Sequence, residues 1–207
     1  MGIEPNLSFF ILVVMCGYFV GSIPFGVLIT KLFSSSDIRK VGSGNIGATN
    51  VLRSSGPVLA ILTLILDAGK GFTAVIIGTN IIGVYSIQEA SQIGGLIAGA
   101  GSVLGHNFPL WLRFNGGKGV ATTLGMMIGS VPLVGFMACV IWICMAIIFR
   151  YSSVAALIAL ATSPIFALIL GMTNPALMFF ALAILGWVRH WSNINRLIKG
   201  DEPHIGK

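Results

Sequence analysis

The sequence predicts an all-α polytopic membrane protein with about seven transmembrane helices. Only 9% of its 207 residues are charged, whereas a soluble domain of ordinary composition has about 25%. Most of the apolar runs between these charges reach the ~20 residues that a helix needs to cross a bilayer. The charge-free runs are residues 5–30, 71–88, 90–112, 120–149 and 151–188.

Seven spans are expected, at residues 7–32, 57–85, 91–112, 119–131, 132–149, 152–171 and 174–189. The first is charge-free until its last turn, and the second contains one acidic and one basic residue. The third carries a Gly/Ala-rich run over residues 94–101, which favours close helix packing. The fourth is short, and Pro132 divides it from the fifth. The sixth is free of charges. Aromatic side chains near Trp111 and Trp187 suit the membrane interface at the ends of the third and seventh.

The basic residues determine the expected orientation. With the N-terminus outside the cell, all Lys and Arg residues except Lys70 fall on the cytoplasmic side, as the positive-inside rule predicts. Glu4 and Glu89 fall outside, so the chain is expected to be N-out and C-in. The net charge of +6 is explained by this topology, so no nucleic-acid partner is expected. The cytoplasmic basic residues are Lys31, Arg39, Lys40, Arg53, Arg113, Lys118, Arg150, Arg189, Arg196, Lys199 and Lys207.

The loop between the first two expected spans combines glycines with polar and basic side chains. Gly42, Gly44 and Gly47 match the G-x-G-x-x-G pattern. A dinucleotide site requires a preceding strand and a βαβ unit, but here a membrane helix precedes the glycines. They still allow backbone N–H groups to converge on an anion. We therefore predict a phosphate-binding loop, with an ordinary flexible loop as the alternative. Further donors and positive charge come from Ser43, Asn45, Thr49, Asn50 and Arg53.

A second glycine-rich loop, Gly116-Gly117-Lys118-Gly119, precedes the fourth expected span. It resembles a nucleotide-binding P-loop only in its Gly-Lys pair, because Gly119 stands where Ser or Thr would bind Mg²⁺. Nucleotide hydrolysis is therefore not expected. A lysine at a helix N-terminus is nevertheless suited to bind an anion. The alternative is a plain topology anchor.

Two further polar features accompany the loops. Asp67 and Lys70 are spaced i, i+3, so one helix face can hold them as an ion pair. Charges inside a membrane are costly and often functional, and structural and functional roles are both open for this pair. The C-terminal segment 189–202 is basic and amphipathic. It can contribute to the same site as the two loops, or it can serve only as a membrane-surface anchor. His190 lies in it, at the same membrane level as the two loops.

These patterns leave two functions open. The six acidic residues form no cluster that could hold two metal ions, so no metal site and no metal-dependent phosphotransferase is expected. A cationic, glycine-lined interfacial site suits an enzyme that joins a soluble phosphorylated substrate to a lipid. It also suits a membrane transporter of phosphorylated or anionic solutes. Transporters favour internal repeats, and no convincing repeat occurs here, so the enzyme is preferred.

Three motifs occur in order: Gly42-Ser43-Gly44-Asn45-Ile46-Gly47-Ala48-Thr49-Asn50-Val51-Leu52-Arg53, then Gly116-Gly117-Lys118-Gly119-Val120-Ala121-Thr122, then His190-x-x-Asn193 followed by Gly200-x-Glu202. They resemble the motifs of the bacterial acyl-phosphate:glycerol-3-phosphate acyltransferases, the PlsY family. The segments Gly21-Ser22-Ile23-Pro24 and Leu66-Asp67-x-x-Lys70-Gly71 extend the resemblance over nearly the whole chain.

The resemblance implies a single integral-membrane domain over residues 1–207, in the bacterial cytoplasmic (inner) membrane, with its active site facing the cytoplasm. The implied reaction transfers a fatty acyl group from acyl phosphate to the 1-hydroxyl of glycerol 3-phosphate. Its products are lysophosphatidic acid, a phospholipid precursor, and phosphate. Acyl phosphate is already an activated mixed anhydride, so no cofactor is expected.

The resemblance also implies roles for individual residues. The expected catalytic residues are Ser43, Arg53, Lys118 and His190. The expected substrate-binding residues are Gly42, Gly44, Asn45, Thr49, Asn50, Gly116, Gly117, Gly119 and Asn193. The expected supporting residues are Asp67, Lys70, Gly200 and Glu202. Two roles are open for His190, which can act as a general base with an ordinary pKa of ~6.5, or can bind and orient glycerol 3-phosphate.

Overall fold

The structure is a computed structural model that describes residues 7–34, 37–83 and 88–206. Within this part the chain is helical. The α-helices are α1 (Leu7–Gly21), α2 (Phe25–Phe33), α3 (Ala48–Ser55), α4 (Pro57–Gly83), α5 (Gln88–Asn107), α6 (Val120–Ser130), α7 (Pro132–Phe149), α8 (Ser152–Ile169), α9 (Thr173–Arg189) and α10 (Trp191–Lys199), and the 3₁₀ helices are η1 (Ile38–Lys40) and η2 (Leu110–Leu112). Outside the described part lie Glu4, Lys207, residues 84–85 and the side chain of Glu89.

Each expected span contains a helix, but two ranges are corrected. The first range is not one helix, because α1 ends at Gly21 and α2 begins at Phe25. Pro24 interrupts it, since proline lacks a backbone N–H and disfavours helical geometry in the residue before it. The third helix ends at Asn107 and not at residue 112, because Pro109 redirects the chain into the separate turn η2.

Helix length and composition support a multi-pass membrane protein. Among the described residues, four segments are long and apolar enough to cross a membrane: Leu7–Phe33, Pro57–Gly83, Pro132–Phe149 and Ser152–Ile169. Two more apolar helices, α6 and α9, are shorter. The all-helical class is therefore confirmed, whereas the count of seven spans stays a prediction.

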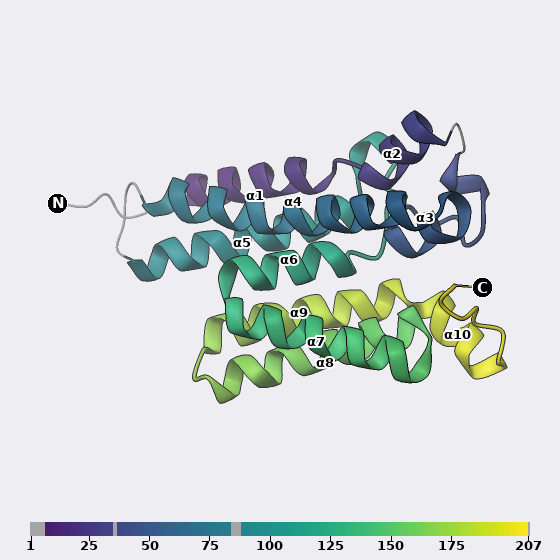
Figure 1. The fold of residues 1–207 in the computed structure, drawn as a ribbon. Coiled ribbons are helices and arrows are strands. Elements are labelled where there is room, and N and C mark those ends of the chain that lie inside the picture. The colour runs from purple at the N-terminus through teal and green to yellow at the C-terminus, as the bar shows by residue number, and fades with distance from the viewer. Residues whose placement is uncertain (1–6, 35–36, 84–87, 207) are drawn as a thin grey trace.

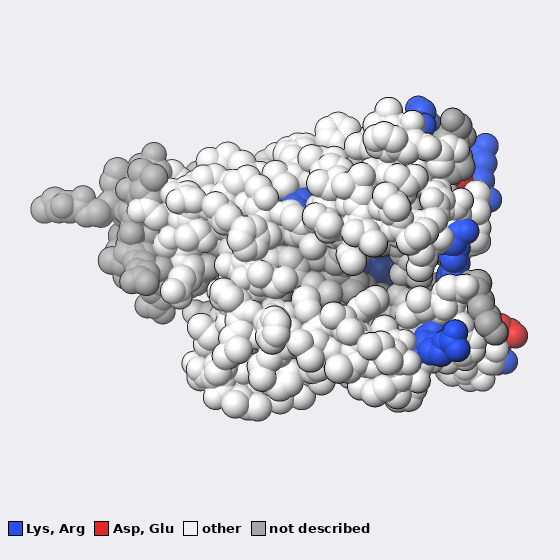
Figure 2. All heavy atoms as spheres, viewed as in Figure 1, with Lys and Arg blue, Asp and Glu red and all other residues white. Residues whose placement is uncertain are grey.

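The helices form two groups that lie side by side (Figure 1). One group contains α1, α4, α5 and α6, and the other contains α7, α8 and α9. The short helices α2, α3 and α10 gather at one end, opposite the start of α1, so segments from the beginning and the end of the chain meet there (Figure 1). Most of the visible Lys and Arg side chains also gather at this end (Figure 2).

Glycine allows the helices of the first group to pack closely. A Cβ on Gly17 of α1 would lie 2.0 Å from the carbonyl oxygen of Ala98 in α5. A Cβ on Gly101 of α5 would lie 2.6 Å from the carbonyl oxygen of Val14. Both distances are too short for a side chain, so the packing role expected for the run 94–101 is confirmed.

Candidate active site

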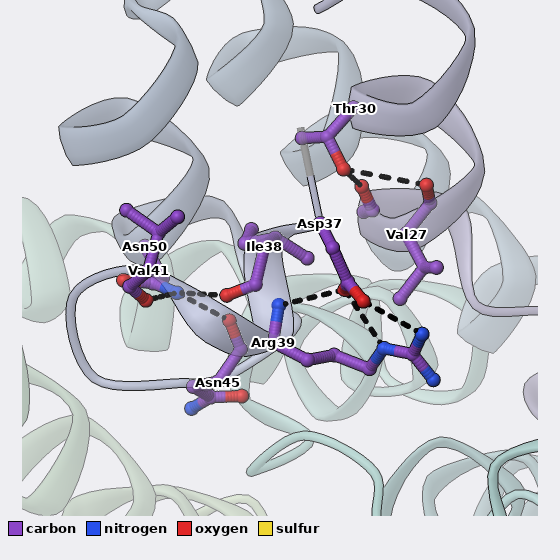
Figure 3. A network of polar contacts seen from close by, with 9 residues as sticks. Val27, Thr30, Asp37, Ile38, Arg39, Val41, Asn45 and Asn50 are labelled. Carbon is purple, nitrogen blue, oxygen red and sulfur yellow. Dashed lines mark hydrogen bonds and ion pairs between the residues drawn. The ribbon is translucent and has the colours of Figure 1, made fainter. Parts of the chain in front are cut away.

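The first glycine-rich loop is folded around the side chain of Asn50, in the first turn of α3. Its Nδ2 donates to the carbonyl oxygens of Ile38 (3.1 Å), Val41 (3.0 Å) and Asn45 (2.9 Å), as Figure 3 shows. Its Oδ1 accepts from the backbone N–H of Ser43 at 3.1 Å. Asn50 is buried, and its amide holds the loop in shape.

The same loop depends on backbone conformations that glycine favours. Gly42 and Gly44 have φ angles of +57° and +70°, in the left-handed region that other residues rarely adopt. A Cβ on Gly42 would also lie 2.4 Å from Oδ1 of Asn50.

Where the loop begins, the carboxylate of Asp37 accepts from Nε of Arg39 at 2.8 Å (Figure 3). This bond lowers the pKa of Asp37 to about 2.

The second glycine-rich loop lies across the end of α5. The backbone N–H of Gly116 donates to the carbonyl oxygen of Asn107 at 3.2 Å, and that of Gly117 to the carbonyl oxygen of His106 at 3.0 Å. Gly119, with φ of +78°, is the residue before α6. Lys118 therefore stands directly at the N-terminus of α6, as the sequence indicated.

The C-terminal motif connects to this lysine through hydrogen bonds. Nζ of Lys118 donates to Oδ1 of Asn193, and Nδ2 of Asn193 donates to Oε1 of Glu202 at 2.6 Å. Glu202 also accepts from Ser153 (2.7 Å) and from Nε of Arg196 (2.8 Å). This network joins the second loop, the start of α8 and the chain after α10.

Arg53 and His190 are also held by backbone atoms. Arg53 donates to the carbonyl oxygen of Pro203 at 3.3 Å, next to Glu202. Nδ1 of His190 lies 2.7 Å from the carbonyl oxygen of Gly186. A carbonyl oxygen only accepts, so Nδ1 carries the proton and Nε2 of the neutral ring has a free lone pair.

These segments line one cavity of about 350 Å³. Figure 2 shows a recess between the two helix groups, with basic side chains inside it. The predicted site residues that line the cavity are Ser43, Asn45, Thr49, Asn50, Arg53, Asp67, Lys118, Gly119, His190, Asn193 and Glu202. The remaining ones are not among its described lining residues: Gly42, Gly44, Lys70, Gly116, Gly117 and Gly200.

Much of the cavity wall is apolar, and sequence reasoning missed it. The wall is formed by α4 and, far from it in the sequence, by the consecutive helices α6 and α7. Ile65 of α4 and Ile143 of α7 line the cavity and are 60% and 53% exposed, so the cavity reaches the outer surface between these helices. The apolar lining residues include Leu64, Ile65, Ala68, Leu124, Ile128, Cys139, Trp142 and Ile143.

The predicted Asp67–Lys70 ion pair is present, and a histidine joins it. Oδ1 of Asp67 lies 2.9 Å from Nζ of Lys70 and 3.6 Å from Nδ1 of His106. Lys70 also donates to the carbonyl oxygen of Ile23 at 3.0 Å, where the chain breaks between α1 and α2. All three ionisable residues are buried. His106 has no motif around it, so only the fold reveals that it faces Asp67.

Burial and neighbouring charges set the ionisation of the two central groups. Burial lowers the pKa of Lys118 to about 8, although the nearby carboxylate of Glu202 opposes the change. Burial and then the positive charge of Lys118 lower the pKa of His190 to about 4. At neutral pH the lysine is therefore mostly charged and the histidine is neutral.

Comparison with known proteins identifies the family. A family model described as glycerol-3-phosphate acyltransferase matches residues 11–200. The glycerol-3-phosphate acyltransferase of Rhodospirillum rubrum is 48% identical over 192 residues, which cover 93% of this chain and 89% of that protein. That of Paramagnetospirillum magneticum is 50% identical over 190 residues, covering 92% and 90%. The chain belongs to the glycerol-3-phosphate acyltransferase family.

Two solved structures extend the family comparison to the fold. The crystal structure of PlsY, an integral membrane glycerol 3-phosphate acyltransferase, in its glycerol 3-phosphate form has a TM-score of 0.86 and 37% identity, covering 95% of this chain and 96% of that one. The lysophosphatidic acid form has a TM-score of 0.84 and 35% identity, covering 95% of each chain. The predicted resemblance to the PlsY family is confirmed.

Proposed function

We propose that this protein transfers a fatty acyl group from acyl phosphate to the 1-hydroxyl of glycerol 3-phosphate, releasing lysophosphatidic acid and phosphate. One observation carries the proposal: a single cavity joins a cationic, glycine-lined end to an apolar wall that reaches the outer surface. Acyl transfer from a lipid-borne donor to a soluble phosphate ester requires both an apolar surface for the acyl chain and a cationic surface for the phosphate groups. The family membership and the solved relatives support this choice.

The cationic end suits the phosphate groups of the two substrates. Lys118 and Arg53 line it, and among the described residues their hydrogen-bond partners are neutral, an amide and a backbone carbonyl. The start of α6 adds backbone N–H groups and a positive helix dipole beside Lys118. Ser43 adds a hydroxyl donor from the first loop. The apolar wall suits the acyl chain, which can enter sideways from the bilayer between α4 and α7.

The reaction can proceed without a protein base. The 1-hydroxyl oxygen of glycerol 3-phosphate attacks the acyl carbonyl carbon, a carbon–oxygen ester bond forms, and the bond from carbon to the phosphate oxygen breaks. Phosphate leaves with the electron pair, and one of its oxygens takes the hydroxyl proton. His190, whose pKa of about 4 makes it a weak base, accepts a hydrogen bond from the hydroxyl through Nε2 and positions it.

We also propose that the chain spans the bacterial cytoplasmic membrane seven times, N-out and C-in, with the cavity facing the cytoplasm. The gathering of basic side chains at the end with α2, α3 and α10 supports this orientation (Figure 2). Single cysteines at Thr173 and Lys199, in a variant lacking Cys16, Cys139 and Cys144, provide the test. An impermeant maleimide added to spheroplasts should label position 173 and spare position 199. The reverse pattern contradicts the orientation.

Purified protein tests the reaction itself. It is given glycerol 3-phosphate with palmitoyl phosphate, palmitoyl-CoA or palmitoyl-acyl carrier protein, and lysophosphatidic acid is measured. Palmitoyl phosphate should support turnover with one phosphate released per lysophosphatidic acid, and chelator should not inhibit it. Turnover with only one of the other two donors contradicts the proposed donor. Glycerol 3-phosphate uptake into vesicles without acylation would favour a transporter.

A further inference from the structure

Arg189, in the last turn of α9, binds the backbone of the second glycine-rich loop. Its Nε donates to the carbonyl oxygen of Gly117 at 3.2 Å. One terminal nitrogen donates to the carbonyl oxygens of Gly116 (3.2 Å) and Gly117 (2.9 Å). The guanidinium carbon also lies 5.0 Å from the centre of the Phe108 ring. A planar fork suits two adjacent carbonyl groups, whereas a single ammonium does not.

The same loop also packs against His106. A Cβ on Gly117 would lie 2.1 Å from Nε2 of this ring, and ring carbons are the next nearest atoms, at 2.9 and 3.0 Å. The ring is 4% exposed, and its Nδ1 faces Asp67 at 3.6 Å. The loop therefore contacts both a guanidinium group on α9 and a buried ring on α5.

Lys118 follows Gly117 directly, so these two contacts set where its backbone begins. Arg189 is not among the described residues that line the cavity, and its donors point at loop carbonyls. We propose that Arg189 is a positioning residue. It holds Lys118 at the cationic end of the cavity by fixing the glycine-rich loop, which packs against the His106 ring. The proposal rests on the proposed function in one respect, namely that Lys118 binds a substrate phosphate.

Substitutions of Arg189 distinguish positioning of the loop by its guanidinium group from a simple effect of its positive charge. Arg189→Ala and Arg189→Lys should both lower kcat/KM about 10- to 100-fold, because both lose the two-carbonyl fork. Arg113→Ala is the matched control: it removes an exposed cation from the segment between η2 and this loop and should retain activity within about 2-fold. Near-normal activity of Arg189→Lys would overturn the proposal in favour of a simple charge effect.

The decisive measurement is a double-mutant cycle with Lys118→Ala. If Arg189 acts through Lys118, adding Arg189→Ala to Lys118→Ala should lower kcat/KM by less than about 2-fold further. A merely structural role predicts the full loss again in that background, and that result would overturn the proposal. Each assay uses whichever of the three acyl donors supports wild-type turnover. Failure of the proposed donor is thus distinguishable from failure of this inference.

A second double-mutant cycle tests the contact between Gly117 and the His106 ring without changing Lys118. Gly117→Ala should lower kcat/KM at least about 10-fold, because its methyl group collides with the His106 ring. His106→Ala removes the ring, so the double variant should be no less active than His106→Ala alone. Losses that multiply in the double variant would show that the ring does not set the position of this loop.

Discussion

Two groups of charges, one inside the helices beside the cavity and one at its cationic end, are arranged in opposite ways. Inside the helices, Asp67 and Lys70 pair at 2.9 Å, so the acidic and basic charges balance. At the end near α3 and α10, the hydrogen-bond partners of Lys118 and Arg53 in the described part of the chain are an amide and a carbonyl, both neutral. A buried charge with its counterion present is tolerated by the fold, and becomes costly only when that counterion is removed. Cations with neutral partners instead leave charge available for an anionic ligand. The comparison separates supporting residues from substrate-binding residues.

The largest effect is expected where the balanced pair is broken. Asp67→Ala leaves Lys70 buried without its counterion, and such changes typically cost ~3–5 kcal/mol of folding free energy. Thermal unfolding in detergent should show a markedly lower Tm, with activity lost in proportion to folded protein.

A matched double variant sharpens this test. Asp67→Leu with Lys70→Met removes both charges, and its Tm should return close to that of the wild type. An Asp67→Ala protein that keeps its Tm but has no activity would contradict the supporting role and place Asp67 among the groups that act on substrate.

The opposite result is expected at the cationic end. Lys118→Ala and Arg53→Ala should each lower kcat/KM roughly 10–150-fold, since a hydrogen bond to a charged group is worth ~1.5–3 kcal/mol. Their Tm should not fall. Ser43→Ala should also lower kcat/KM, and Lys31→Ala, which removes an exposed cation from α2, should not. Normal kinetics in all three loop variants would make both loops topology anchors only.

Sequence patterns predicted most of the polar residues of the site, because they lie in short motifs. Local composition indicated Ser43, Lys118 and His190 as candidates for anion binding or proton acceptance, and the family resemblance joined their motifs. The roles of Arg189 and His106 were not predictable, since their partners are backbone atoms and a residue on another helix. The apolar wall was also missed, because membrane helices are apolar on every face and the composition does not mark the face that lines a cavity.

A smaller effect is expected from pH. Burial lowers the pKa of Lys118 to about 8, so the free enzyme loses this positive charge as pH rises through that value. Because the charged form binds phosphate, kcat/KM should fall above pH ~8, toward 10-fold per unit, while kcat at saturation changes less since bound phosphate favours the charged lysine. Lys118→Arg should be slower but lack this alkaline decline. The same decline in that variant would assign it to another group.

The smallest effect is expected at His190, although it lies beside Lys118. Its ring is neutral at working pH, and its Nδ1–H is used by Gly186, so Nε2 can offer one neutral hydrogen bond, worth ~0.5–1.5 kcal/mol. His190→Asn and His190→Gln should therefore raise KM for glycerol 3-phosphate roughly 2- to 12-fold and retain most of kcat. Steady-state kinetics from roughly pH 3.5 to 9, a range that includes the His190 pKa of about 4, separate the two roles. A general base predicts a loss in kcat of ~10³-fold or more at saturating substrate, together with disappearance of the acidic limb of the pH profile. That pair of results would show that the histidine, and not the leaving phosphate, takes the proton.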